Sequence, residues 1–190
     1  MERLSLHRAI QTWIADRIGP ELVKIEHPFP QHFADLYWPE KNLIFEIQCS
    51  PLSIQEAIKR NEDYEALGLH VIWILHQKTF NQRVVGATEL YLRSRSAYYT
   101  DIYSNNTGMI YDQDELVLGH RRVFRSQRYR IEKFEVEPLS WPQTWVRRVQ
   151  IDALWRHGKR PIVLKFDRRY KNLKQMLRLF ATHWRFFSKF

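Results

Sequence analysis

Residues 33–48 read FADLYWPEKNLIFEIQ, and this stretch decides the fold. Two six-residue apolar runs flank a polar connection of four residues that begins with proline. Such a pattern predicts a β-hairpin. In an antiparallel pair of strands, the residue numbers of any two facing residues add up to the same value. If Trp38 faces Leu43 across the turn, then Asp35 faces Glu46. Directly opposed side chains share one face of the sheet, with Cβ atoms about 4.5–5.5 Å apart.

Two carboxylates held this close repel each other, and one of them is pushed toward its protonated form. A divalent cation bound between Asp35 and Glu46 removes the conflict. Magnesium is the natural candidate, since it binds one or two carboxylates, keeps several waters and accepts phosphate oxygens. Gln48 lies two residues beyond Glu46 and therefore on the same face. Its neutral amide can position a water or a phosphate oxygen but supplies no positive charge.

The surrounding sequence predicts an α-β-β-β-α-β core. The capping box Ser53-Ile-Gln-Glu56 begins a helix that Gly68 ends. The continuous apolar run that follows predicts a buried strand, parallel to the second hairpin strand through a right-handed crossover. The predicted elements are a helix over 3–18, strands over 21–29, 33–38 and 42–48, a helix over 53–68 and a strand over 69–76.

The next part of the chain predicts a helix over 80–95, a loop over 98–111, and strands over 116–124 and 129–136 joined near residues 125–127. Arginines are dense here and alternate with Phe124 and Tyr129. Such a ribbon can bind phosphates and stack on bases, and a solvated hairpin tip explains the same pattern equally well. The arginines are Arg121, Arg122, Arg125, Arg128 and Arg130.

The positive charge is concentrated near the end of the chain. Residues 141–190 hold 13 Lys or Arg and two acidic residues, whereas the whole chain has a net charge of +9. A near-neutral body with a strongly basic end is typical of proteins that bind polyanions, although basic segments also serve solubility alone. We therefore expect a core domain over 1–140 and a basic, aromatic-rich extension over 141–190. Within the extension we expect a helix after residue 144, a short strand over 162–166 and a basic amphipathic helix over 168–190. The candidate phosphate-binding residues there are Arg147, Arg148, Arg168 and Arg169.

Composition narrows the class of protein further. One cysteine, Cys49, excludes a disulfide framework and a cysteine-rich zinc site. No apolar run approaches the length of a membrane span, and the first residues lack the pattern of a signal peptide. A reducing, cytoplasmic setting is therefore expected.

The hairpin also carries a family resemblance. Asp35 followed by Glu46-x-Gln48 resembles the core motif of PD-(D/E)xK nucleases. A longer set of residues resembles the nuclease-like domain of the competence protein CoiA family, over about residues 4–76. That set comprises Gln48-Cys49-Ser50-Pro51, Ser53, Arg60, Tyr64, Gly68 and the strand 71–75.

The resemblance implies an α/β, PD-(D/E)xK nuclease-like core with a mixed sheet flanked by helices. It also implies that Asp35, Glu46 and the backbone carbonyl of Ile47 hold Mg²⁺, with Mn²⁺ as a substitute, and that Gln48 orients the attacking water. Arg60 either reaches a phosphate near the metal or pairs on the surface with a neighbouring acid. His7 is interpreted as a partly exposed helix histidine, although the resemblance adds some weight to a role at the site.

The expected function is divalent-metal-dependent hydrolysis of DNA phosphodiester bonds, in recombination, repair or the processing of incoming DNA. The alternative is a nuclease-fold module that binds DNA with little or no catalysis and assists recombination or competence. A structural interaction protein is the third reading. The expected partner is double-stranded, single-stranded or branched DNA, and a homodimer and recombination proteins are compatible with it.

Overall fold

The computed structural model describes residues 2–113, 115–138 and 162–164. The helices predicted within 141–190 lie outside this range. Within it the chain forms a mixed sheet of seven strands in the order β1-β2-β3-β4-β5-β6-β9, together with two two-stranded ribbons, β7-β8 and β10-β11. The helices are α1 (Glu2–Ile18), α2 (Ile54–Ala66) and α3 (Ala87–Ser94), with a 3-10 turn, η1 (Pro39–Lys41). The strands are β1 (Lys24–Pro28), β2 (Phe33–Trp38), β3 (Leu43–Gln48), β4 (His70–His76), β5 (Ala97–Thr100), β6 (Ile110–Asp112), β7 (Glu115–Leu118), β8 (Arg121–Arg125), β9 (Tyr129–Arg130), β10 (Val136–Pro138) and β11 (Ile162–Leu164).

The predicted hairpin is confirmed in its strands and in its register next to the turn, whereas the predicted pairing of Asp35 with Glu46 is not among the described pairs. β2 pairs antiparallel with β3, and the paired residues run from Trp38↔Leu43 to Leu36↔Phe45. Proline begins the η1 turn, and Asn42 ends it in the left-handed region, with φ at 48°. Asparagine tolerates this conformation because its short polar side chain bonds locally. The described pairing stops one residue before Asp35.

The α-β-β-β-α-β order is also confirmed. The helix α2 begins at Ser53, whose side chain accepts a hydrogen bond from the backbone N–H of Glu56. The Glu56 side chain bonds Arg60 instead of closing the capping box. β4 pairs parallel with β3 on one side and with β5 on the other. The carboxyl ends of three neighbouring parallel strands therefore meet at one edge of the sheet.

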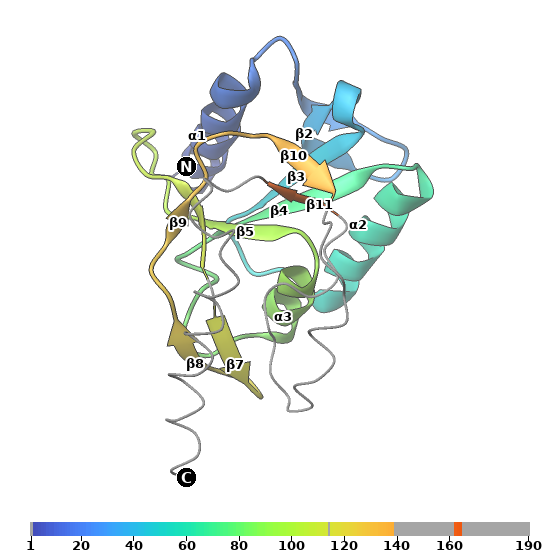
Figure 1. Ribbon diagram of the computed structural model, residues 1–190. Coiled ribbons are helices and arrows are strands. Elements are labelled where there is room, and N and C mark those ends of the chain that lie inside the picture. The colour runs from blue at the N-terminus through green and yellow to red at the C-terminus, as the bar shows by residue number, and fades with distance from the viewer. Residues whose placement is uncertain (1, 114, 139–161, 165–190) are drawn as a thin grey trace, which may run out of the picture.

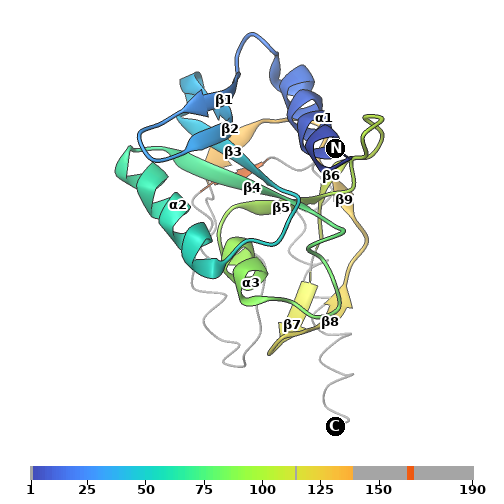
Figure 2. The same cartoon turned by 180° about the vertical axis from the view of Figure 1, so that it is seen from behind.

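The two faces of the sheet have separate apolar cores. α1 packs Ile10, Trp13 and Ile14 against one face, together with alternate residues of β3 and β4. α2 and α3 cover the other face, around Trp73 and Tyr99. Figures 1 and 2 show α1 well apart from α2 and α3. Since odd-numbered β3 residues belong to the α1 core, Glu46 and its neighbour Ile44 face α2.

The prediction of a loop over 98–111 is wrong at both ends. β5 lies between β4 and β6, and its tyrosines Tyr98 and Tyr99 are fully buried. Only the segment between β5 and β6 is a loop, and Gly108, at φ +119°, lies near its end. The sequence Asn-Asn-Thr-Gly is a turn signal flanked by aromatic strands, so the mistake lay in extending the loop over the strands on both sides.

The strands predicted over 116–124 and 129–136 are also placed differently. Gly119, at φ +56°, turns the chain in the middle of the first segment and divides it into β7 and β8. Only Tyr129–Arg130 of the second segment joins the sheet, as β9 against β6. The helix expected over 80–95 is limited to α3. The short strand expected near 162–166 is present as β11, which pairs antiparallel with β10.

Candidate nuclease-like site

Asp35 lies where the backbone pairing of β2 and β3 stops. Beyond that point its side chain, rather than its backbone, forms the hydrogen bond to β3. Its Oδ2 accepts a hydrogen bond of 2.6 Å from the backbone N–H of Ile47. Gln11 of α1 donates to the Asp35 carbonyl at 3.2 Å. The carboxylate is therefore fixed between the two strands rather than free to rotate into solvent.

His7 is the third contact of Asp35. Its Nε2 lies 3.1 Å from Asp35 Oδ1, and the two side chains are 29% and 19% exposed. Burial alone lowers the pKa of His7, but the hydrogen bond and the charge of Asp35 outweigh it and raise the pKa above its ordinary value. His7 is thus a partly exposed helix histidine, as interpreted from the sequence, and it also belongs to this site.

Glu46 is almost completely buried, with 1% of its surface exposed. Both of its oxygens bind side chains from α2: Tyr64 donates its hydroxyl to Oε1 at 2.8 Å, and Arg60 donates Nη1 to Oε2 at 2.9 Å. Burial and then the nearby charge of Asp35 raise the pKa of Glu46 to about 8, against the opposing effect of Arg60. Glu46 therefore has less compensating positive charge than a buried carboxylate needs.

Asp35 thus lies close enough to Glu46 to raise the pKa of Glu46, but the two carboxylates are held from different sides. Asp35 binds α1 and the β3 backbone, whereas Glu46 binds α2. In the described part of the chain, no three His, Cys, Asp or Glu residues are arranged as a ready-made metal site. A cation shared by the two carboxylates remains a prediction.

Gln48 ends β3 beside these groups. Its Nε2 donates to the Ser50 carbonyl at 2.7 Å and lies 3.3 Å from the Ser50 hydroxyl. This use of the amide nitrogen holds the turn that leaves the strand. The amide oxygen has no protein donor among the described residues, so it remains able to accept a hydrogen bond from a water.

The sequence left two interpretations of Arg60, a phosphate contact or a surface ion pair with a neighbouring acid. Arg60 forms that ion pair, with Glu56, and it also binds Glu46. Its Nη2 donates to Glu56 Oε1 at 2.7 Å, while Nη1 holds Glu46. Burial lowers the pKa of Arg60, but Glu46 outweighs that effect and the pKa is raised. The sequence signal for this arrangement is the spacing of Arg60 and Tyr64, which places both on one face of α2.

The expectation that Arg122 contacts nucleic acid is corrected by its burial. Its side chain is 1% exposed and pairs with Glu115 and Glu89. Arg121 and Arg125 are exposed, and Arg128 is 43% exposed and bonded to Asp101. The remaining predicted arginines, Arg147, Arg148, Arg168 and Arg169, lie outside the described residues.

Arg122 belongs to a buried ionic network that the sequence analysis missed. Arg93, fully buried, donates to Glu115 at 2.6 Å and to Asp112 at 3.2 Å. Tyr99 donates its hydroxyl to Glu89 at 2.7 Å. The network joins α3, β5, β6 and the β7-β8 ribbon. No local pattern distinguishes a buried arginine from an exposed one, so the sequence offered no signal for it.

Comparison with known proteins identifies the family. Residues 8–144 match the family described as competence protein CoiA, nuclease-like domain. The chain belongs to this family. The match extends well beyond residue 76, where the resemblance noted from the sequence stopped, and it takes in β5 to β10 of the CoiA nuclease-like domain. Neither the curated proteins nor the solved structures yielded a match. Among the described residues, no helix has both the length and the apolar character required to cross a membrane.

Proposed function

We propose that this CoiA nuclease-like domain is a divalent-metal-dependent nuclease that hydrolyses DNA phosphodiester bonds. The observation that supports it best is the raised pKa of Glu46, caused by burial and by the charge of Asp35. A nearby cation lowers the energy of exactly such an undercompensated pair of acids.

The donor set has the chemistry that a hard cation requires. Asp35, Glu46 and the carbonyl of Ile47 supply oxygen ligands, which suit Mg²⁺ and Mn²⁺. These three residues would hold the ion. When bound, a divalent ion of this kind neutralises charge on a phosphate and lowers the pKa of a coordinated water.

The other side chains have defined tasks under this proposal. The amide oxygen of Gln48 accepts a hydrogen bond from the attacking water and so orients it. Asp35 keeps His7 charged to a higher pH than an isolated histidine, which places a cationic donor next to the acids. Arg60 releases Glu46 and retains Glu56, so that its guanidinium stays at the edge of the site and can bind a phosphate oxygen.

The test is cleavage of linear, circular, single-stranded and branched DNA with Mg²⁺ or Mn²⁺, by wild type and by Asp35→Asn and Glu46→Gln. Both variants should lose at least about a hundredfold in rate, as expected for removal of a metal ligand's charge. Glu62→Gln is the matched control, because it removes an exposed acid of the same helix α2 that the proposal gives no task. Cleavage by wild type that persists unchanged in both site variants would refute this assignment.

A second candidate is a DNA-binding module of the same fold with little or no catalysis, assisting recombination or competence. It is favoured by a different observation, namely that both Glu46 oxygens already accept hydrogen bonds from Arg60 and Tyr64. A cation must then displace an arginine. Salt-sensitive DNA binding, with no heat of Mg²⁺ or Mn²⁺ binding and no cleavage, would select this candidate over the first.

A further inference from the structure

The carboxyl ends of β3, β4 and β5 meet beside the candidate site. Gln48 pairs with Leu75, and His76 pairs with Thr100. Directly after β4, Thr79 donates its hydroxyl to the Cys49 carbonyl at 2.7 Å. The chain that leaves β4 is therefore bonded to the chain that leaves the site. Ligands of open α/β sheets bind outside this kind of edge.

Arg128 lies on the same edge in a fixed orientation. Its Nη1 binds Asp101 at 2.7 Å, and its Nη2 binds the Gln77 side chain at 2.9 Å. Its guanidinium also stacks over the Tyr111 ring, 4.5 Å from the centroid. An arginine held in this way loses little conformational freedom when it binds a phosphate.

Two further cations accompany Arg128. Lys78 and Arg125 are exposed, and neither forms an ion pair within the described residues. Lys78 directly follows Gln77, which binds Arg128, and Arg125 ends β8 three residues before Arg128. Burial raises the pKa of Tyr111, whereas the hydrogen bond from Asn81 and the charges of Arg128 and Arg125 lower it. Lys78 and Asp101 likewise both act on the pKa of His76, at the end of β4, which burial lowers.

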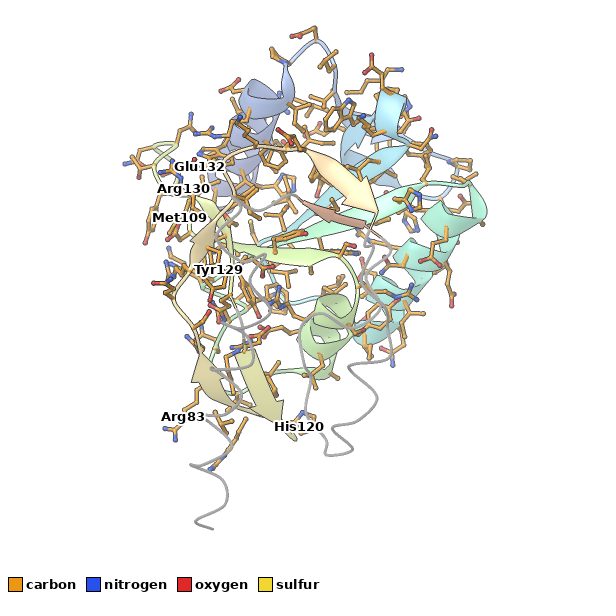
Figure 3. The ribbon with its side chains drawn as sticks, in the orientation of Figure 1. Arg83, Met109, His120, Tyr129, Arg130 and Glu132 are labelled. Carbon is orange, nitrogen blue, oxygen red and sulfur yellow. The ribbon has the colours of Figure 1, made fainter. Side chains whose placement is uncertain are left out.

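We propose that Lys78, Arg125 and Arg128 form a second phosphate-binding surface, which holds the backbone of the nucleic acid beyond the bond at the Asp35–Glu46 site. This inference depends on the proposed binding of nucleic acid but not on catalysis. Asp101 is the acid bonded to the surface, and it orients Arg128 while leaving the three residues with a net positive charge. Figure 3 labels Met109, which directly precedes β6, and Tyr129 of β9, which follows Arg128 in the chain.

The position of the surface predicts the length of substrate it serves. Lys78 follows β4, and Arg128 contacts residues after β4 and β5 and the Tyr111 ring of β6, so the surface lies one to three strand spacings from β3, or about 5–15 Å. At about 3.4 Å of rise per nucleotide this corresponds to roughly one to four nucleotides. A strand extending at least six nucleotides past the site should reach the whole surface, and one that ends at the site should not reach it.

The test measures binding of labelled DNA, duplex and single-stranded, over a series of salt concentrations in EDTA. The triple variant Lys78→Gln/Arg125→Gln/Arg128→Gln should lower the slope of log K against log[salt] by about 2–3, with at least about tenfold weaker binding near 0.1 M salt. A substrate that ends at the site should bind wild type and variant alike.

The control Lys41→Gln/Lys59→Gln/Arg95→Gln removes the same charge from other elements and should leave the slope within about 0.5 of wild type. Since loss of Arg128 frees Asp101, the double variant Lys78→Gln/Arg125→Gln provides a second measurement, with an expected decrease of about 1–2.

The proposed surface would be refuted if the slope of log K against log[salt] were equal for the triple variant and the control. It would also be refuted if wild-type DNA binding were too weak to detect at low salt. Cleavage is scored separately. If the slope decreases as expected while Mg²⁺ and Mn²⁺ support no cleavage, the surface stands and the nuclease proposal fails. If cleavage occurs and the slopes are equal, the nuclease proposal stands and the surface fails.

Discussion

Replacement of Glu46 by glutamine should change how the stability of the protein depends on pH. The pKa of Glu46 is raised from 4.5 to about 8 in the folded protein, whereas in the unfolded chain it returns to about 4.3. Between these values the folded state binds more protons than the unfolded state. Wild-type stability should therefore be greatest below about pH 4.3, as far as this group is concerned, and should be lost progressively up to about pH 8.

The size of the effect follows from the shift. Each pKa unit corresponds to about 1.4 kcal/mol, so Glu46 should cost the folded state on the order of 3–5 kcal/mol between about pH 4 and 8. The side chain is buried, so solvent screening does not reduce this figure much. Glutamine is uncharged and can still accept from Arg60, while the Tyr64 hydroxyl can rotate to accept from its amide.

The assay is urea unfolding of metal-free protein at several pH values between 5 and 9 and constant ionic strength. The stability of Glu46→Gln relative to wild type should rise by a few kcal/mol over this range. Glu56→Gln, which removes an acid 48% exposed on the same arginine, should follow the wild-type curve. A Glu46→Gln curve parallel to wild type within about 0.5 kcal/mol would refute the idea that the buried acid lacks compensation.

Three other outcomes follow from the described contacts. Arg93→Met leaves buried carboxylates without their cation and should destabilise the fold by about 3–5 kcal/mol in urea unfolding; a loss below about 1 kcal/mol would mean that the network is dispensable. Gly108→Ala should lower stability by about 2 kcal/mol or more, because a Cβ there would lie 2.6 Å from the Cα of Ile102 at a φ of +119°, whereas Gly86→Ala, with open space around it, is the control. Calorimetric affinity for Mn²⁺ should rise about tenfold per pH unit up to about pH 8 as Glu46 loses its proton, and a pH-independent affinity would separate the ion from this residue.

The first half of the fold could be predicted because its signals are local. Two apolar runs around Pro39 predict the hairpin, and a one-residue slip would exchange the two faces of β3 and turn Glu46 away from α2. The Ser53 cap and the uninterrupted β4 sequence are similarly self-contained. What the register could not reveal is that Asp35 bonds the Ile47 backbone instead of extending the ladder.

The second half was less predictable because a buried ionic network lies beside its apolar core. Burial of Tyr99 depends on Arg93 and Arg122, which lie in α3 and β8 and meet only in three dimensions. A search for hydrophobic periodicity does not detect buried charged residues of this kind. Gly119 between two apolar runs is a turn signal, and it would have predicted the observed hairpin of β7 and β8.

The two functional candidates differ in a single competition at Glu46. Arg60 already places a positive charge 2.9 Å from Oε2, and it is held in turn by Glu56. Because the pKa of Glu46 is raised in spite of this arginine, the guanidinium only partly compensates for the buried charge. A divalent ion offers twice the charge and would also act on Asp35, which Arg60 does not bind in this structure. Under the nuclease proposal the ion therefore competes with both Arg60 and the Glu46 proton, and the proton makes this competition depend on pH.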